Sequence, residues 1–262
     1  MSDLTGRAIA TDYGWMALGN ERLEADGATL IRNPSVALIR DANQVIRVTA
    51  STPHAVDRLL ARADREYADC PHRQFRLDFT AAPEFEARLA LEGYARDDTL
   101  LMLLEGELAG RPQPHDVRPV ADEAAWLDYA ALHELDLREY GEKVPGGIEA
   151  GVAEQMMRCR RTKSPPVRYW LAYVDGRPSA YLASWEGLDG VGQVEDLFTH
   201  PEFRHRGLAT ALLHQCVADC RAHGAGPVVI AADITDTPKR MYAALGFRPV
   251  ATSRTYRREL RR

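Results

Sequence analysis

The chain has few cysteines, no long apolar run and no excess of basic residues. Its 262 residues include four cysteines and no Cys-x-x-Cys pair, which argues against a disulfide framework and for a reducing, cytoplasmic location. Cys216 and Cys220 lie one helical turn apart and are predicted to be small core residues. No run approaches the roughly 18 apolar residues that a membrane-spanning helix needs. Asp3 and Arg7 stand near the N-terminus with no apolar stretch behind them, so we expect neither a signal peptide nor a membrane anchor.

Basic residues are outnumbered, since 33 Lys and Arg stand against 38 Asp and Glu and give a formal net charge of −5. Phosphate backbones bind to basic surfaces, so this balance argues against a general nucleic-acid binder. The eight histidines show no spacing typical of metal ligands, and we expect no metal. With 45% hydrophobic and 27% charged residues, the composition is typical of an ordinary soluble globular protein.

The length predicts between one and two domains at roughly 150 residues per domain. Proline and glycine are concentrated at 110–118, between two apolar runs, which is typical of a linker. We therefore predict an N-terminal lobe over residues 1–112 and a second lobe over residues 113–262.

Apolar spacing and turn residues predict a mixed order of helices and strands in the second lobe. Two helices come first, separated by the breaker Val-Pro-Gly-Gly at 144–147. The elements expected are helices at 121–140 and 147–160, strands at 168–174, 179–186 and 192–199, a helix at 207–223, a strand at 227–232, a helix ending near 244 and a strand at 247–259. This order predicts an α/β fold with a mixed central sheet flanked by helices.

The first lobe repeats part of that order in shorter form. It is predicted to contain strands at 45–48, 74–79 and 95–104, with helices at 55–67 and 85–91 between them. Gly93-Tyr94 also stands where Gly246-Phe247 stands in the second lobe. The repetition predicts an internal duplication and a two-lobed pseudo-dimer, although two α/β lobes can share an order by chance.

One loop in the second lobe has the features of a phosphate site. A strand ends at Thr199, and Arg204-x-x-Gly207-x-Ala209 then leads into a helix. Successive backbone N–H groups and the positive end of the helix dipole predict a cradle for a diphosphate. Gly207 and Ala209 let the backbone approach closely, while Arg204 and Arg206 can add charge-assisted hydrogen bonds. The alternative is a basic loop that happens to precede a helix.

This loop resembles the acetyl-CoA-binding signature of the GNAT superfamily of N-acetyltransferases. A second match is Tyr242-x-x-Leu245-Gly246-Phe247, which is similar to the closing helix motif of that family. The resemblance implies the acyl-CoA N-acyltransferase fold, with two GNAT-like lobes in tandem. The first lobe is degenerate in this comparison, because its corresponding loop at 51–57 has no glycine, and we expect it to bind no CoA.

The resemblance also implies a set of residues that bind acetyl-CoA. The pantetheine arm is expected to lie beside the third strand of the second lobe, and the amides of the loop are expected to hold the pyrophosphate. The implied residues are Leu197, Phe198, Thr199, Arg204, His205, Arg206, Gly207, Leu208, Ala209, Thr210 and Thr235. Thr235 stands where the family often has Asn, and either Thr235 or Thr237 is expected to cap the last helix.

The implied reaction requires a general base. An amine acceptor has a pKa of roughly 10 and must lose a proton before it attacks a thioester. Alternation along the strand predicts Glu195, Leu197 and Thr199 on one face, with Asp196 and Phe198 on the other. The segment is similar to the corresponding strand of diamine acetyltransferases, which favours Glu195 as the base. Asp196 and a water molecule are alternatives, as is a purely structural role for both acids.

Tyr242 matches the tyrosine of the family whose phenol protonates the departing thiolate, and packing on the sheet is the alternative. Together the motifs predict an acetyl-CoA-dependent N-acetyltransferase that acts on a primary amine of a small molecule or peptide, by direct attack in a ternary complex. A non-catalytic CoA-sensing or protein-docking module is the alternative function. We expect a monomer, itself a pseudo-dimer, or a homodimer.

The acceptor pocket of the family is built from the first two helices and the loop between them, here about residues 126–157. Acidic and aromatic side chains in this stretch predict a lining for a cationic amine, whereas a solvated helix face with aromatics in the core is the alternative. The candidates are Glu134, Asp136, Glu139, Glu142, Trp126, Tyr129, His133 and Tyr140, with Trp185 and Glu186 near the same cleft.

Overall fold

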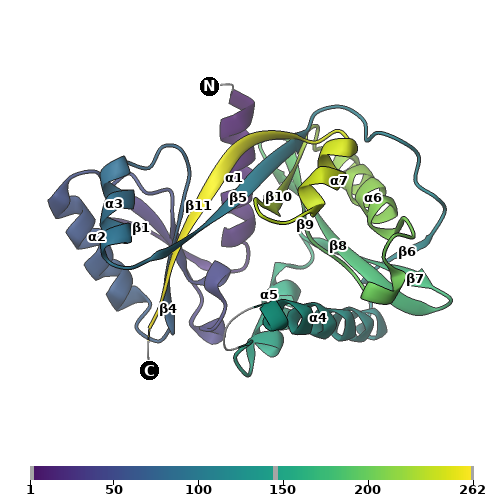
Figure 1. The fold of residues 1–262 in the computed structure, drawn as a ribbon, viewed down its shortest axis with the longest axis horizontal. Coiled ribbons are helices and arrows are strands. Elements are labelled where there is room, and N and C mark those ends of the chain that lie inside the picture. Colours follow the sequence, from purple (N-terminus) through teal and green to yellow (C-terminus); the bar gives the residue numbers. More distant parts are fainter. Residues whose placement is uncertain (1–2, 144–146, 261–262) are drawn as a thin grey trace. The chain divides into compact units, whose positions relative to one another are not determined.

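The computed structural model describes residues 3–143 and 147–260 (Figure 1). The chain divides into two compact units that alternate along the sequence. Unit 1 comprises Met1–Met102, Ala231–Lys239 and Pro249–Arg262, and unit 2 comprises Leu103–Ile230 and Arg240–Arg248. The predicted breaker at 144–147 lies, in its first three residues, outside the described part of the chain.

Unit 1 contains the five elements predicted for the first lobe together with an N-terminal helix and hairpin that were not predicted. Its elements are α1 (Asp3–Ala17), β1 (Glu21–Ala25), β2 (Ala28–Arg32), β3 (Gln44–Ile46), α2 (Pro53–Glu66), β4 (His72–Leu77), α3 (Pro83–Leu91) and most of β5 (Ala95–Leu104) and β11 (Arg248–Glu259). The strand order includes β1-β2-β3-β4-β11. β3 runs parallel to β4, and β11 runs antiparallel to it (Figure 1).

Helices cover both faces of the unit 1 sheet. Phe75 and Leu77 of β4 are fully buried in one core with residues of α2 and α3. Arg76, which lies between them, faces the other way and donates two hydrogen bonds to Asp12 of α1, each 3.1 Å long. The alternation of a strand thus places α1 on one face and α2 and α3 on the other.

The sequence did not reveal α1 because its buried face is partly polar. Thr11 and Asp12 are 0% and 1% exposed, and Tyr13 donates to the carboxylate of Asp78 at 3.0 Å. An apolar stripe is the main signal of an amphipathic helix, and polar residues that are paired in the core interrupt that stripe.

Unit 2 contains the elements predicted for the second lobe except its last strand, which is β11 and lies mostly in unit 1, and it has one additional short strand. Its elements are β6 (Asp116–Pro119), α4 (Glu123–Lys143), α5 (Val152–Lys163), β7 (Arg168–Val174), β8 (Arg177–Leu188), β9 (Val191–Thr199), α6 (Leu208–Ala222) and parts of β10 (Val228–Asp233) and α7 (Pro238–Ala244). The strand order includes β10-β9-β8-β7-β6, with β9 and β10 parallel. The predicted linker at 110–118 is too long, because residues 116–118 belong to β6 and pair antiparallel with β7.

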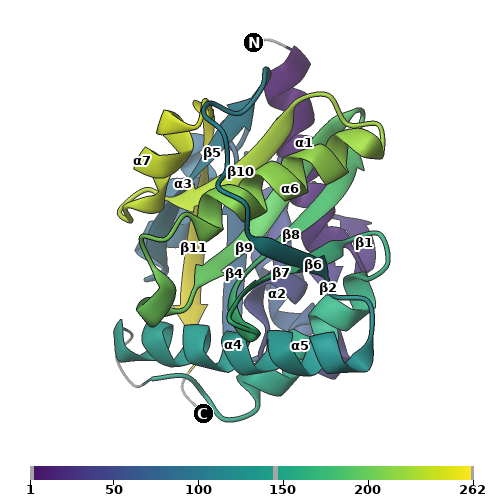
Figure 2. The same ribbon diagram turned by 90° about the vertical axis from the view of Figure 1, so that its right-hand side faces the viewer.

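The unit 2 sheet is also covered on both faces. Ser184 of β8 donates to Asp219 of α6, while Tyr181 of the same strand donates to Asp136 of α4. Residues an odd number of positions apart on a strand point to opposite faces. α6 therefore lies on one face, as Figure 2 shows, and α4 lies on the other. Both units are mixed sheets flanked by helices, which confirms the predicted fold class.

The two lobes end their last helices in the same way. The amide of Tyr94 donates to Leu89 O after α3, and the amide of Phe247 donates to Tyr242 O after α7, both at 3.0 Å. The glycine before each aromatic residue has a positive φ. This is the Schellman arrangement, which favours glycine because only glycine enters the left-handed region without strain. Leu89 of the first lobe thus occupies the place of Tyr242.

All four cysteines are free thiols, and Cys216 and Cys220 are buried as predicted. Within residues 3–143 and 147–260, no helix combines the length and the apolar character that a membrane crossing requires.

Replacing Asp12 by Ala is expected to lower the free energy of unfolding by about 3 kcal/mol, because the buried guanidinium of Arg76 loses the carboxylate that Asp12 supplies. Urea denaturation measures the loss. Asp57→Ala is the matched control: Asp57 pairs with Arg88 at 2.7 Å nearer the surface, and a much smaller loss is expected because solvent screens an exposed ion pair. Equal losses in the two variants would contradict a special role for the buried pair.

Candidate active site

β9 contains a bulge at Asp196. Ala183 of β8 pairs with Glu195, and Tyr181 pairs with Phe198, so one residue more is present on β9 than on β8 over this stretch. Asp196 has a φ of 65°, in the left-handed region that L-residues seldom adopt. Bulges of this kind bend a strand and redirect its side chains.

The bulge corrects the alternation predicted for this strand. Paired residues of antiparallel strands lie on the same face, and Tyr181 and Ala183 are two positions apart on β8. Glu195 and Phe198 therefore share a face, whereas strict alternation over 195–199 placed them on opposite faces. The prediction was wrong because sequence alone does not show where a strand accommodates an extra residue.

The loop after β9 leads directly into α6. A short turn of helix spans Pro201–Phe203, and His205 and Gly207 have φ values of 62° and 82°. Gly207 is the N-cap of α6 and provides no side-chain hydrogen bond. Since the first N–H groups of a helix have no partner within the helix, those of α6 are left to a partner from outside it. Their partial positive charge favours an anion.

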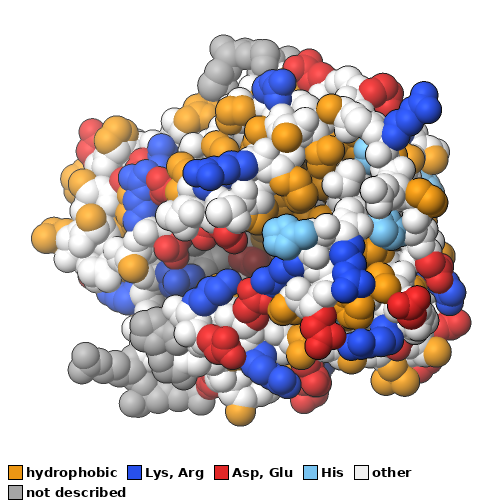
Figure 3. Space-filling model, turned by 45° about the vertical axis from the view of Figure 1, so that its right-hand side comes forward, with side chains coloured by type: hydrophobic (Ala, Val, Ile, Leu, Met, Phe, Trp, Pro, Cys, Tyr) orange, Lys and Arg blue, Asp and Glu red, His pale blue; other side chains and the backbone are white. Residues whose placement is uncertain are grey.

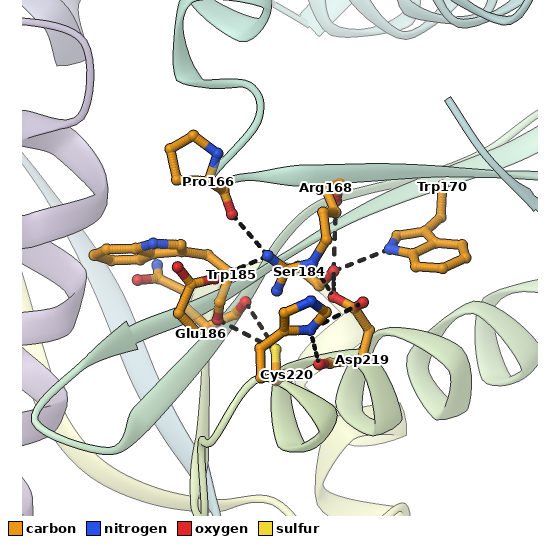
Figure 4. Close-up of polar contacts among 10 residues, drawn as sticks. Pro166, Arg168, Trp170, Ser184, Trp185, Glu186, Asp219 and Cys220 are labelled. Atoms are coloured by element: carbon orange, nitrogen blue, oxygen red, sulfur yellow. Dashed lines mark hydrogen bonds and ion pairs between the residues drawn. The ribbon is translucent and has the colours of Figure 1, made fainter. Parts of the chain in front are cut away.

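A buried polar cluster fixes α6 against the sheet (Figure 4). Asp219 of α6 accepts hydrogen bonds from Ser184 and from Arg168, each 2.6 Å long. Ser184 accepts from the indole N–H of Trp170 at 2.9 Å, and Arg168 also donates to Glu186 at 2.8 Å. Glu186, an acceptor candidate from the sequence, is thus part of this cluster. These contacts hold the helix whose N-terminus follows the loop.

The two arginines of the loop have partners within the protein. Arg204 donates through Nε to Thr199 O at 3.1 Å and through Nη2 to Glu139 of α4 at 2.5 Å. The hydrogen bond from Arg204 lowers the pKa of Glu139. The guanidinium of Arg206 lies over the ring of Phe203, 5.3 Å from its centroid. To bind a phosphate strongly, Arg204 must use its remaining N–H groups or leave Glu139.

Thr235 does not cap the last helix. α7 begins at Pro238, so Thr237 rather than Thr235 stands directly before it. Both the amide and the hydroxyl of Thr235 donate to Asp233 at 2.6 Å, which closes a tight turn after β10. The turn separates Thr235 from the helix, which rules out Thr235 as the cap, whereas the alternative Thr237 stands at the position before the helix. A contact between Thr235 and a cofactor stays a prediction.

Tyr242 lies in α7 and is 4% exposed. Its ring packs near that of Phe247, with 6.1 Å between the centroids. The packing role is therefore present, and it does not exclude a role for the phenol in catalysis.

A buried arginine lies next to the bulge. Arg160 of α5 is 6% exposed, and its guanidinium is 3.3 Å from the carboxylate of Asp196. Its Nε donates to the hydroxyl of Tyr129 at 3.0 Å. Burial alone would lower the pKa of Arg160, but Asp196 and the surrounding tyrosines raise it well above its ordinary value. The positive charge is therefore permanent.

A directed chain of hydrogen bonds leads from Arg160 to Asp136. A guanidinium only donates, so His133 Nε2, which is 3.5 Å from Arg160, accepts. His133 Nδ1 then carries the proton and donates to the hydroxyl of Tyr181 at 3.2 Å. Tyr181 in turn donates to Asp136 Oδ2 at 2.5 Å. Burial and the charge of Arg160 lower the pKa of His133 to about 2, so the ring is neutral and the chain ends on a carboxylate.

The structure separates the four acidic candidates of α4. Asp136 receives the hydrogen bond of Tyr181, and Glu139 receives that of Arg204. Glu134 and Glu142 instead line a groove together with the first residues of α5. The aromatic candidates divide as well, since Tyr140 is exposed and the others are buried, namely Trp126, Tyr129, His133 and Trp185.

Sequence reasoning missed Arg160 and Tyr181. Arg160 stands among other basic residues in 158–161, a composition that is typical of a solvated helix face. Tyr181 lies in an apolar strand where any aromatic residue suits the core. No local signal distinguishes either residue, because their contacts join α4, α5, β8 and β9.

Charged side chains of both signs are interspersed over the face of the molecule in Figure 3. In the described ranges, no group of three or more His, Cys, Asp or Glu residues is arranged to hold a metal ion.

Stability is expected to fall by about 1 kcal/mol per pH unit below about pH 6.5 because of His133. The unfolded chain binds a proton on this ring below that pH, whereas the folded ring stays neutral down to about pH 2. His133→Gln should remove this slope, as measured by urea denaturation between about pH 6.5 and pH 5. The exposed His54, changed to Gln, is the control. Equal slopes in wild type and His133→Gln would contradict the prediction.

Comparison with known proteins gives a family and a fold. The family model described as "Acetyltransferase (GNAT) family" matches residues 129–247. A search of curated proteins found no match. A functionally unknown conserved protein from Staphylococcus epidermidis is 15% identical with a TM-score of 0.73, and the match covers 93% of this chain and 96% of that chain.

Two further solved structures cover most of the chain. A GCN5-related N-acetyltransferase from Kribbella flavida is 18% identical with a TM-score of 0.68, over 98% of this chain and 95% of that chain. A tandem GNAT protein from the clavulanic acid biosynthesis pathway is 16% identical with a TM-score of 0.58, over 82% and 75%. The matched domain contains the bulged strand, the glycine-capped helix and Tyr242. The comparisons thus identify a GNAT acetyltransferase domain at residues 129–247, and the solved structures show that the chain shares the fold of GNAT proteins over most of its length.

Proposed function

We propose that this protein is an acetyl-CoA-dependent N-acetyltransferase that acetylates a primary amine of a small molecule or peptide. The observation that carries the proposal is the N-terminus of α6. This helix follows the bulged strand β9, and its N-cap Gly207 has a left-handed backbone and provides no side-chain hydrogen bond. Such an N-terminus suits the diphosphate of acetyl-CoA, and it lies within the GNAT domain.

The donor site is proposed along β9 and the loop that follows. The pantetheine arm lies beside the strand, and the amides of the loop and of the first turn of α6 bind the diphosphate. Within 4 Å of a Cβ built on Gly207, the described residues contribute one atom, His115 Nε2 at 3.4 Å. This openness supports a close approach of a ligand to the amides. The proposed contacts are Leu197, Phe198, Thr199, Arg204, His205, Arg206, Gly207, Leu208, Ala209, Thr210 and Thr235.

The first lobe differs at the corresponding helix, α2. Its N-cap is Thr52, whose hydroxyl accepts from the amide of Ala55 at 3.3 Å, and Pro53 at the start of the helix has no N–H to offer. Part of the anion-binding capacity of this N-terminus is therefore used or missing. The comparison supports a single donor site, in the lobe that we assign to residues 113–262 and not in that of residues 1–112.

The reaction that we propose is direct transfer in a ternary complex. The neutral amine attacks the thioester carbonyl, a new C–N bond forms, and the C–S bond breaks. A base accepts the proton that the amine loses, and an acid protonates the thiolate of CoA. We assign these roles to Glu195 and Tyr242.

The geometry of the bulge supports Glu195 over Asp196 as the base. The carboxylate of Asp196 is already paired with the buried guanidinium of Arg160 at 3.3 Å, so it is engaged within the protein. Glu195 comes directly before Asp196 in the strand, and it lies on the same face of the sheet as Phe198. A water molecule held by Glu195 would serve the same purpose.

Acetyl-CoA is expected to bind the wild type at one site per chain and Gly207→Glu at least tenfold more weakly, because the added carboxylate repels the diphosphate. Isothermal titration calorimetry measures both affinities. Failure of the wild type to bind would contradict the donor site.

Two variants separate charge from backbone strain in that experiment. Gly207→Ala adds only a Cβ in the left-handed region, at a cost of about 1 to 2 kcal/mol, and should bind more tightly than Gly207→Glu. Gly93→Glu adds the same charge away from the α6 N-terminus, at a glycine with a φ of +77° and no atom of the described residues within 4 Å of the new Cβ. This variant should keep the wild-type affinity, and a loss equal to that of Gly207→Glu would show that the effect does not depend on the α6 N-terminus.

Tyr242→Phe and Glu195→Gln are each expected to lower kcat by about 100-fold with little change in the affinity for acetyl-CoA, because each removes a proton-transfer group. Initial rates with a broad amine panel, together with calorimetry, measure the two quantities. Unchanged turnover in both variants would overturn the roles assigned to these residues and leave the proposed function standing.

A non-catalytic CoA-sensing or protein-docking module is the competing function. It would be favoured if the wild type bound acetyl-CoA tightly and acetylated no amine of the panel.

A further inference from the structure

We infer that Asp136 binds a positively charged group of the acceptor, and that the acceptor is an amine with a second positive charge. The inference rests on the proposed N-acetyltransferase function and specifies the class of substrate.

Asp136 is held in place and remains accessible. Its side chain is 39% exposed, and its Oδ2 accepts the hydroxyl of Tyr181 at 2.5 Å. No hydrogen bond or ion pair from the described part of the chain reaches Oδ1. One oxygen therefore fixes the carboxylate, and the other can accept from a ligand.

The charge of Asp136 is poorly compensated within the protein. Burial raises the pKa of this carboxyl, and Asp196 and Glu139 add to the effect. The hydrogen bond from Tyr181 and the charge of Arg160 lower this pKa, but they do not offset the burial. Arg160 is already paired with Asp196, and the neighbouring His133 is neutral. A carboxylate in such surroundings gains more from a cation than one that is already paired.

The position of Asp136 relative to the proposed base points to two charges on the acceptor. Asp136 binds Tyr181, which lies opposite Phe198, whereas Glu195 lies opposite Ala183. Two residues of a strand span roughly 7 Å. The amine that reacts near Glu195 and the cation that binds Asp136 are therefore two separate groups. A single acceptor supplies both if it carries a second ammonium group.

The other acidic candidates on α4 are engaged elsewhere or face a different groove. Glu139 is paired with Arg204 of the loop, and Glu134 and Glu142 line the groove beside α5. Among the four, Asp136 is the one that accepts a hydrogen bond from β8, the strand that pairs with β9 of the proposed donor site.

The test compares a four-carbon diamine with the amino alcohol of the same length, in the wild type, Asp136→Asn and Glu134→Gln. The Asn side chain keeps an oxygen for Tyr181 and removes the charge, while Glu134→Gln removes the same charge from the other groove. We expect kcat/KM of the wild type to favour the diamine at least tenfold, about 1.4 kcal/mol, through KM. Asp136→Asn should lose this preference with kcat retained, and Glu134→Gln should keep it.

A preference that survives in Asp136→Asn, or that the wild type lacks, would overturn the inference. If Asp136→Asn proves unstable, Tyr181→Phe takes its place in the test. This variant keeps the charge of Asp136 and removes the hydrogen bond that positions it, so a partial loss of the preference for the diamine is expected.

Calorimetry of the diamine with the CoA-bound wild type and with CoA-bound Asp136→Asn gives a readout without turnover. Weaker binding to the variant, with no acetyl transfer by the wild type, would refute the proposed function and support the cation site. Equal binding would refute the site.

Discussion

The left-handed backbone of Asp196 is the constraint on which the candidate site depends. It inserts one extra residue into β9, so that Glu195 and Phe198 face the same side although three positions separate them. A non-glycine residue in this conformation requires compensation from its surroundings. The ion pair between Asp196 and the buried Arg160 provides an attractive interaction at that residue.

Arg160 in turn organises the polar residues on the α4 side of the sheet. Because its guanidinium only donates, it orients His133, and the order of donors continues through Tyr181 to Asp136. Burial and the same charge together lower the pKa of His133 and keep its ring neutral. A buried network in which every member has a partner is rigid, and this one ends on a carboxylate that solvent reaches. The opposite face is fixed by Asp219, which ties α6 to β7 and β8.

The two lobes share a local design and differ at the helix N-terminus that we propose binds the diphosphate. Both close their last helix with the same hydrogen bond before an aromatic residue, at Tyr94 and at Phe247. The helix N-termini differ, because Thr52 caps α2 with its own hydroxyl while Gly207 leaves α6 without a side-chain cap. Unit 1 is built from segments distant in the sequence, since the C-terminal strand β11 pairs with β4.

The sequence by itself determined the fold class, nearly all elements of unit 2 and the GNAT domain that the family model matches, because apolar periodicity, turn glycines and the two motifs are local properties of the chain. It did not reveal α1, whose stripe is interrupted by the paired Asp12, or β6, which is defined by its pairing with β7. Only the tertiary structure decided the bulge at Asp196 and the network of Arg160. Both arise from contacts between residues far apart in the sequence, in which a buried charge is stabilised by partners that no spacing rule brings together.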